Sequence, residues 1–198
     1  MIKYLRVIIM NYTKGNIKEL FNYWNNKIAE YSLPTWEELP LFDLYMDQVI
    51  TLINNYLSIY SEATGDERGI TQSMINNYVK LKIIPAPVKK KYSRVHLAYL
   101  IIVCVLKQTL NIATIQNIVP IELSEDEIKQ TYNTFVLNQK KSYSYVSANI
   151  QEIAHNIFNN EKPERINDLI MQVATSANIF KMMSEIIIGT PDDEKETE

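Results

Sequence analysis

An uncharged apolar run near the middle of the chain constrains the fold more than any other feature. Leu97–Leu106 holds ten consecutive residues without a charge or a glycine. A helix that is apolar on all sides has to be buried, and this run is about half of the roughly 20 residues that a membrane-spanning helix needs. It therefore predicts the central helix of a small domain, capped by Ser93 and extending from Arg94 to about Thr109.

The composition favours further helices around this one. The 198 residues include only four glycines and seven prolines, which is more typical of an all-α protein than of a sheet protein. This length fits one domain with a helical extension. The single cysteine, Cys104, excludes a disulfide framework and favours a reducing cytoplasm, and we expect a buried, inert thiol.

A short helix with two different faces is expected at residues 72–80, with Thr71 as its N-cap. At 100° per residue, one arc is apolar and holds Met74, Ile75, Tyr78 and Val79. The opposite arc holds Gln72, Ser73, Asn76, Asn77 and Lys80. Amide side chains can bond adenine in bidentate fashion, so we interpret Gln72, Ser73, Asn76 and Asn77 as candidate base-reading residues. The alternative is that they keep a surface helix soluble.

The segment after this helix adds a basic tip. Leu81–Pro87 is expected to be extended, because Pro85 and Pro87 cannot continue a helix. The candidate phosphate-binding residues lie along it and around it: Lys80, Lys82, Lys89, Lys90, Lys91 and Arg94. A polar-faced helix followed by an extended turn and a basic tip is the outline of a winged helix-turn-helix.

The positions of the charges favour the same interpretation. The net charge is only −3, but no acidic residue occurs in the 54 positions between Glu67 and Glu122, where eight basic residues stand. The rest of the chain has 12 basic and 23 acidic residues. An apolar core over 95–119 explains part of this gap, but not the six cations from Lys80 to Arg94. A segment with many basic residues and no acidic ones indicates a polyanionic partner.

These residues also resemble known families. The phrase SMINNYVKLKIIP, followed by KKYSRVHLAYL, is similar to the DNA-binding end of MerR-type regulators. The matching residues are Tyr78, Ile83, Ile84, Pro85 and Tyr92. Asn76 and Lys82 stand where that family has an arginine and a glycine.

A second resemblance is to the bacterial domain-of-unknown-function family 1836. It rests on residues 36–54, 70–85 and 89–110, and it spans about Leu33 to Val119. The resemblance implies a MerR-like DNA-binding fold and lends no biochemical activity.

Four regions follow from these patterns. Helical periodicity predicts helices at 16–31 and 41–60, separated from the 72–80 helix by a polar loop, Ser61–Gly69. Met1–Met10 is too short for a signal peptide and is either a strand or a stretch upstream of the true start. We predict an N-terminal extension and helix at 1–32, a winged helix-turn-helix DNA-binding domain at 33–120, a C-terminal helical region at 121–190 and a disordered acidic tail at 191–198.

The C-terminal region is expected to hold three helices. Ser124 and Glu127 form a capping box for the first, Ser144 or Ser147 opens the second, and Pro163 lies in the first turn of the third. A short helix at Ile112–Val119 precedes them. Three such helices serve dimerisation, ligand sensing or plain packing, and the residues do not separate these roles.

No motif for chemistry is present. The chain has no glycine-rich phosphate loop, no CxxC and no HExxH, and His96 and His155 are far apart. We therefore expect no enzyme, no cofactor and no metal. The expected partners are double-stranded DNA and a second copy of the chain, with no membrane. The alternatives are a protein-interaction adaptor and a regulator with an effector pocket in the C-terminal helices.

Overall fold

The computed structural model describes residues 14–65, 69–158 and 165–189, and the expected tail and the Met1–Met10 stretch lie outside these ranges. The elements are α2 (Lys14–Glu30), the 3-10 helix η1 (Trp36–Glu38), α3 (Met46–Tyr56), α4 (Ser58–Thr64), α5 (Gln72–Lys80), α6 (Arg94–Leu106), α7 (Ile112–Ile118), α8 (Glu125–Phe158) and α9 (Arg165–Gly189). Within the described residues extended pairing is limited to two isolated bridges, Leu44–Tyr92 and Val88–Lys91. The all-α expectation is confirmed.

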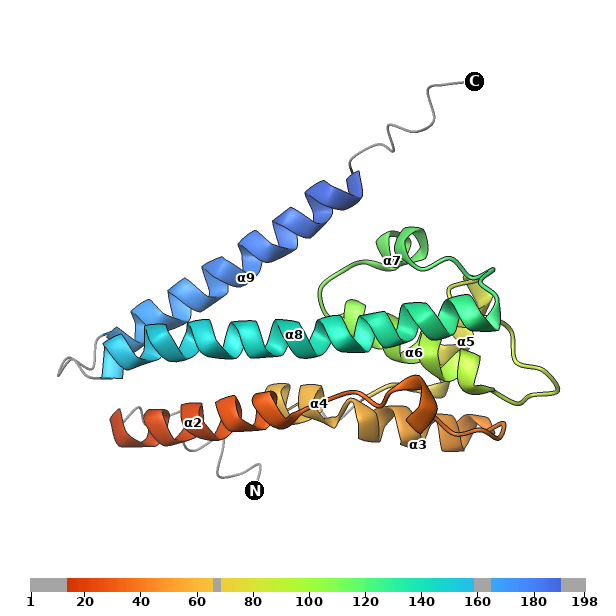
Figure 1. Ribbon diagram of the computed structural model, residues 1–198, viewed down its shortest axis with the longest axis horizontal. Helices are drawn as coiled ribbons and strands as arrows, with labels where there is room; N and C mark the ends of the chain where they lie inside the picture. Colours follow the sequence, from red (N-terminus) through yellow and green to blue (C-terminus); the bar gives the residue numbers. More distant parts are fainter. Residues whose placement is uncertain (1–13, 66–68, 159–164, 190–198) are drawn as a thin grey trace.

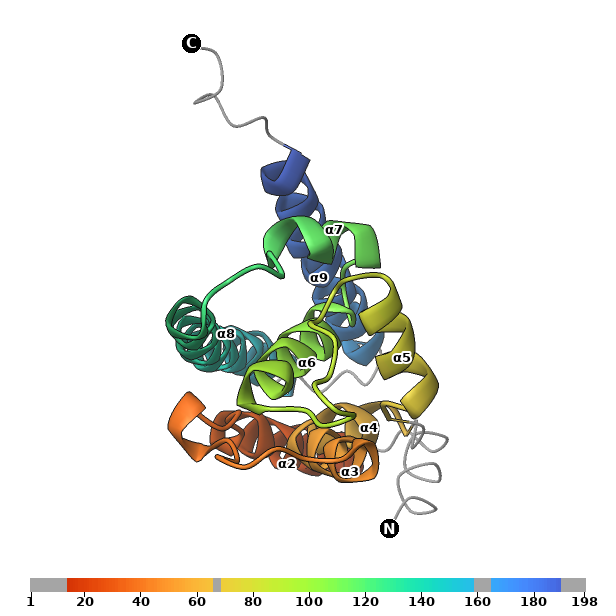
Figure 2. The ribbon, with the colours of Figure 1, turned by 90° about the vertical axis from the view of Figure 1, so that its right-hand side faces the viewer.

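The central position of α6 is also confirmed. All nine residues from His96 to Cys104 are buried, and the end-on view in Figure 2 shows α6 in the middle, with α8, α3, α5 and α7 around it. The helix ends at Leu106, three residues earlier than expected. No helix in the described ranges is long and apolar enough to cross a membrane.

The longest element, α8, connects both ends of the molecule. It lies along α2 and α6 in Figure 1. Near its N-terminus the Tyr132 hydroxyl donates to Pro34 O (2.8 Å), and Asn133 Oδ1 accepts from the Trp36 N–H (2.9 Å). Ile128, Tyr132 and Val136 belong to the same hydrophobic core as α6. The first turns of the C-terminal region are therefore part of the core that residues 33–120 form.

The expectation of three C-terminal helices was wrong, because α8 runs without a break from Glu125 to Phe158. Ser144 and Ser147 do not open a new helix. The Ser144 hydroxyl donates to Lys140 O (3.2 Å) within α8, and the Ser147 hydroxyl donates to Oδ1 of the buried Asn25 on α2 (2.6 Å). A serine inside a helix can bond the preceding turn, so the residue type alone did not mark a start. The Ser124–Glu127 capping box is confirmed.

The helix expected at 41–60 was also wrong in its bounds. It begins only at Met46, because the backbone of Leu44 pairs with Tyr92 through two hydrogen bonds of 2.8 and 2.9 Å. It is interrupted at Leu57, and α4 then continues to Thr64, into the stretch expected to be a loop. The N-terminal helix, by contrast, was placed within two residues of α2.

Candidate nucleic-acid interface

Helix α5 has the two faces that its sequence predicts. The Thr71 hydroxyl accepts from the Met74 N–H (3.3 Å), which confirms the N-cap. Ile75 and Tyr78 are buried against the core. The candidate base-reading residues are all exposed: Gln72, Ser73, Asn76 and Asn77. Within the described residues no hydrogen bond engages these four side chains, so their donors and acceptors face water.

The entry into α5 is fixed by an asparagine from α3. Asn54 Oδ1 accepts from the Ile70 N–H (2.7 Å), and its Nδ2 donates to Ile70 O (3.2 Å). The side-chain amide of Asn54 therefore makes both of the hydrogen bonds that a paired backbone would otherwise make to Ile70. Gly69 has a φ of +50°, and a Cβ there would overlap the Asn54 side chain. The contact orients α5 on α3.

The C-terminal end of α5 is a Schellman turn with a lysine where glycine is usual. The Ile83 N–H donates to Tyr78 O (2.9 Å) and the Lys82 N–H to Val79 O (3.0 Å), the two bonds that define this motif. Lys82 occupies its left-handed position with a φ of 54°. Gln116 Nε2 on α7 donates to Leu81 O (2.5 Å) and supports the same turn.

The basic tip is a single tight turn. The Val88 N–H donates to Lys91 O (3.1 Å), and the Lys91 N–H donates to Val88 O (2.9 Å). The two central residues, Lys89 and Lys90, have φ angles of 50° and 63°, as a type I′ turn requires. The basic tip is thus a two-residue hairpin closed by the isolated bridge between Val88 and Lys91.

All non-glycine residues with positive φ in the described ranges are lysines of this segment: Lys82, Lys89 and Lys90. Left-handed backbone costs about 1 kcal/mol or more for a residue with a Cβ, and glycine or asparagine adopts it more easily. Strain of this kind often accompanies a functional constraint. The chain therefore places cations at positions where its own stability would favour other residues.

The base of the turn is fastened to α6 by His96. Its Nδ1 accepts from the Ser93 N–H (3.0 Å), and its Nε2 lies 3.1 Å from Ala86 O, so the neutral ring with the proton on Nε2 satisfies both. Burial lowers the pKa of His96. His96 therefore caps the N-terminus of α6 and joins it to the segment before the turn.

Arg94 is placed differently from the lysines. Its Nη2 donates to Leu39 O (2.8 Å), and its guanidinium lies 5.5 Å from the centre of the Trp36 ring. Nε is buried. The guanidinium therefore packs α6 against η1 and is not placed in solvent beside the lysines. Lys91 is half-buried, with Nζ 5.4 Å from the Tyr45 ring centre.

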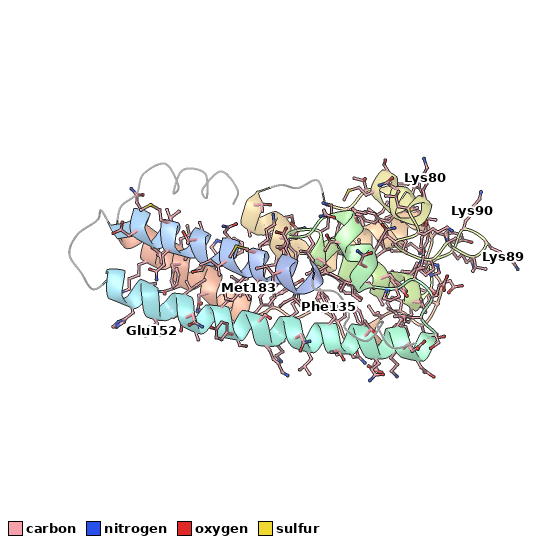
Figure 3. All side chains as sticks on the ribbon, turned by 90° about the horizontal axis from the view of Figure 1, so that it is seen from above. Lys80, Lys89, Lys90, Phe135, Glu152 and Met183 are labelled. Atoms are coloured by element: carbon pink, nitrogen blue, oxygen red, sulfur yellow. The ribbon has the colours of Figure 1, made fainter. Side chains whose placement is uncertain are left out.

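The lysines gather at one end of the molecule. Figure 3 shows Lys80, Lys89 and Lys90 together at the end opposite to Glu152. Four of the lysines predicted to bind phosphate are exposed: Lys80, Lys82, Lys89 and Lys90. In the described part of the chain none of them forms an ion pair, whereas Lys27 pairs with Glu62 and Lys129 with Glu37. Their positive charge is therefore available to a polyanion.

A cavity of about 250 Å³ lies behind α5. It is lined by residues of α5 such as Met74 and Tyr78, by Asn54, and by Cys104 and Lys107. Cys104 is buried, as expected, and burial raises the pKa of its thiol to about 12. The cavity lies next to α5.

These features define an all-helical protein with an exposed polar helix face next to a lysine turn. The family model described as Domain of unknown function (DUF1836) matches residues 34–135, from η1 to the first third of α8. The chain belongs to this family. No curated protein and no solved structure matches it significantly.

Proposed function

We propose that this protein is a cytoplasmic DNA-binding transcriptional regulator with a MerR-like winged helix-turn-helix. The observation that carries the proposal is the exposed, unbonded polar face of α5 beside four unpaired lysines. In this arrangement α5 lies in the major groove, where amides can bond base edges. Lys80, Lys82, Lys89, Lys90 and Lys91 contact phosphates, which fix the position of the helix on the duplex.

A single protomer presents a small surface, so we propose that a homodimer binds a near-palindromic site. Each protomer would neutralise roughly three to five phosphates, and log affinity should fall with log salt at about −0.9 per phosphate. The steep salt dependence separates this proposal from binding through apolar contacts.

The direct experiment is to sequence the genomic DNA that co-purifies with the protein and then to titrate the enriched duplex. We expect one enriched motif, a steep salt slope, and weaker binding when bases within the motif are changed. Equal recovery of all genomic sequences, or a salt slope near zero, would contradict the proposal.

A second candidate is a non-catalytic adaptor that uses the same lysines to hold an acidic protein. The observation favouring it is that the lysine charge is not specific for DNA. Heparin distinguishes the two, because an adaptor should bind heparin and duplex DNA equally, with no preference among sequences. A preference for one duplex sequence over heparin at equal charge would exclude the adaptor.

A further inference from the structure

Helix α9 exposes an unusual amount of apolar side chain. Eight large apolar residues are 47–68% exposed: Ile170, Met171, Ile179, Phe180, Met182, Met183, Ile186 and Ile187. Together they present on the order of 800 Å² of apolar surface, more than the 300–600 Å² of the largest patch on a typical monomer. Figure 1 shows α9 angled away from α8.

The attachment of α9 to the rest of the molecule uses another face. Leu169 is buried, and Val173, Ser184 and Ile188 are half-buried. At 100° per residue these four positions share one side of the helix. The exposed apolar side chains at 171, 179, 182 and 186 lie on nearly the opposite side. Packing within one copy of the chain therefore covers only part of the inner side of α9, where Phe180 and Ile187 stay exposed, and leaves the outer side in water.

The outward face has the spacing of a helix–helix seam. Thr175, Ile179, Met182 and Ile186 follow one another at intervals of four, three and four residues, the repeat with which one helix packs along another. No charged residue occupies these four positions, and the exposed Asp168 lies on the same line one heptad before Thr175. Lys181 and Glu185 lie to one side and pair with each other (3.9 Å). Between residues 175 and 186 the seam therefore offers no charge by which an unlike partner could be selected.

We propose that this seam pairs with the same seam of a second copy of the chain. In a two-fold interface the same residues meet from both copies, so an uncharged apolar seam complements itself. A standard protein interface buries about 800 Å² on each partner, and the four outward residues, half of the eight, supply about half of that area. The inference deepens the homodimer of the proposed function and rests on α9 alone: a monomer in solution would contradict both, whereas a dimer that does not bind DNA would contradict only the proposed function.

The first measurement is the mass of the full-length protein in solution by light scattering over a wide range of concentration. We expect twice the 23.1 kDa of one chain. The mass should persist in concentrated salt, because apolar contacts are not screened as ion pairs are. A monomer at all concentrations would overturn the proposal.

A matched pair of variants tests the face. Ile179→Lys together with Met182→Lys should give a monomer with unchanged helix content by circular dichroism. The control is Ala174→Lys, an exposed position on the same helix about 140° around from Ile179, which should remain dimeric. If the control dissociates and the seam variant does not, the interface lies elsewhere and the assignment is wrong.

Cross-linking gives a readout that does not depend on disrupting the fold. Cysteine is introduced singly at Thr175, Ile179, Met182 and Ile186, and at Ala174 as the control. The native Cys104 is buried and its pKa is raised to about 12, so it should not react. Because residues near a two-fold axis meet their own copies, mild oxidation should join two chains at one or more seam positions and not at 174. No cross-link at any seam position would contradict the pairing.

Discussion

Helices α5 and α9 both present a broad face to water, and the two faces are opposite in chemistry. On α5 the exposed residues are amides, a hydroxyl, a lysine and Met74, whereas α9 exposes isoleucines, methionines and a phenylalanine along with its polar side chains. Water satisfies exposed amides fully, while each exposed apolar Å² forgoes about 25 cal/mol relative to burial. The face of α5 can therefore stay uncovered until a ligand arrives, and the face of α9 is expected to be covered at all times.

The two helices also differ in how firmly the rest of the molecule holds them. Helix α5 is nine residues long and is fixed at both ends, by Thr71 and Asn54 at its start and by the Schellman turn at Lys82. Helix α9 is 25 residues long and rests on a few side chains along one side. Rigid placement suits a surface that reads a pattern, and a long apolar seam suits permanent association.

Reversing the charge of the lysine turn should have the largest effect, and this effect should be confined to DNA binding. Lys89→Glu, Lys90→Glu and Lys91→Glu together should weaken binding to the enriched duplex about 100-fold or more and flatten the salt slope by about one unit per lost contact. Fluorescence anisotropy at several salt concentrations measures both quantities. The α9 dimer should be unaffected.

The matched control reverses three lysines remote from the turn, Lys18, Lys140 and Lys141, which are also exposed. It changes the net charge equally and should alter affinity far less. Equal losses in the two triple variants would mean that total charge, and not the lysine turn, governs binding.

Breaking the asparagine contact should loosen α5 without touching its polar face. Asn54→Ala leaves the Ile70 N–H and carbonyl without their partner, which costs about 1–3 kcal/mol of unfolding free energy. Chemical denaturation measures this loss. Asn55→Ala, at the exposed neighbouring position, should cost under about 0.5 kcal/mol.

Relieving the strained turn should separate stability from binding. Lys89→Asn with Lys90→Gly supplies the residues that a type I′ turn favours, so the unfolding free energy should rise by about 1 kcal/mol. DNA affinity should fall about tenfold, because two phosphate contacts are lost.

Lys91→Gln is the control for this double variant, since Lys91 has no positive φ. It should weaken DNA binding with no gain in stability. If Lys89→Asn with Lys90→Gly stabilises the protein and leaves affinity unchanged, the strained lysines do not contact the duplex.

The smallest effect concerns pH. Because burial lowers the pKa of His96 below the usual 6.5, the unfolded chain binds the proton more readily than the folded one. Its contribution to stability is therefore full above about pH 6.5 and is lost as the pH falls towards the folded pKa. The neighbouring Asp43 carboxylate opposes the shift without reversing it.

We expect the unfolding free energy to fall by under about 1 kcal/mol between pH 7 and 5.5. His96→Gln, which keeps an acceptor for the Ser93 N–H, should remove most of this slope. The carboxylates with lowered pKa, Glu37, Glu38 and Glu127, lose their contribution only at lower pH, below the usual 4.5. An unchanged slope in the variant would mean that another group titrates in this range.

Local signals in the sequence predicted the elements well. The caps at Thr71 and Ser124 were placed at the right residues, and the apolar run marked a helix, α6, that is buried from His96 to Cys104. Helix caps and helical periodicity depend on residues within one or two turns, so they can be identified without knowing the fold. The exposed face of α5 followed from the same periodicity.

The errors fall where a distant segment intervenes. Helix α3 begins later than predicted because the backbone of Leu44 pairs with Tyr92. The Arg94 side chain points inward because Leu39 and Trp36 lie beside it. The continuity of α8 could not be read from Ser147, whose partner is Asn25 on another helix. These partners lie about 50 to 120 residues away in the sequence, beyond the reach of any local pattern.

The sequence by itself therefore determined the all-α class, the caps at Thr71 and Ser124, the burial of α6, and that acids are excluded from residues 68–121. Only the tertiary structure decided that the lysines share one end, that three of them adopt left-handed backbone, and that one side of α9 is left in water. The physical reason is that helix formation is governed by neighbours along the chain, whereas the direction in which a side chain points depends on which distant surfaces become buried.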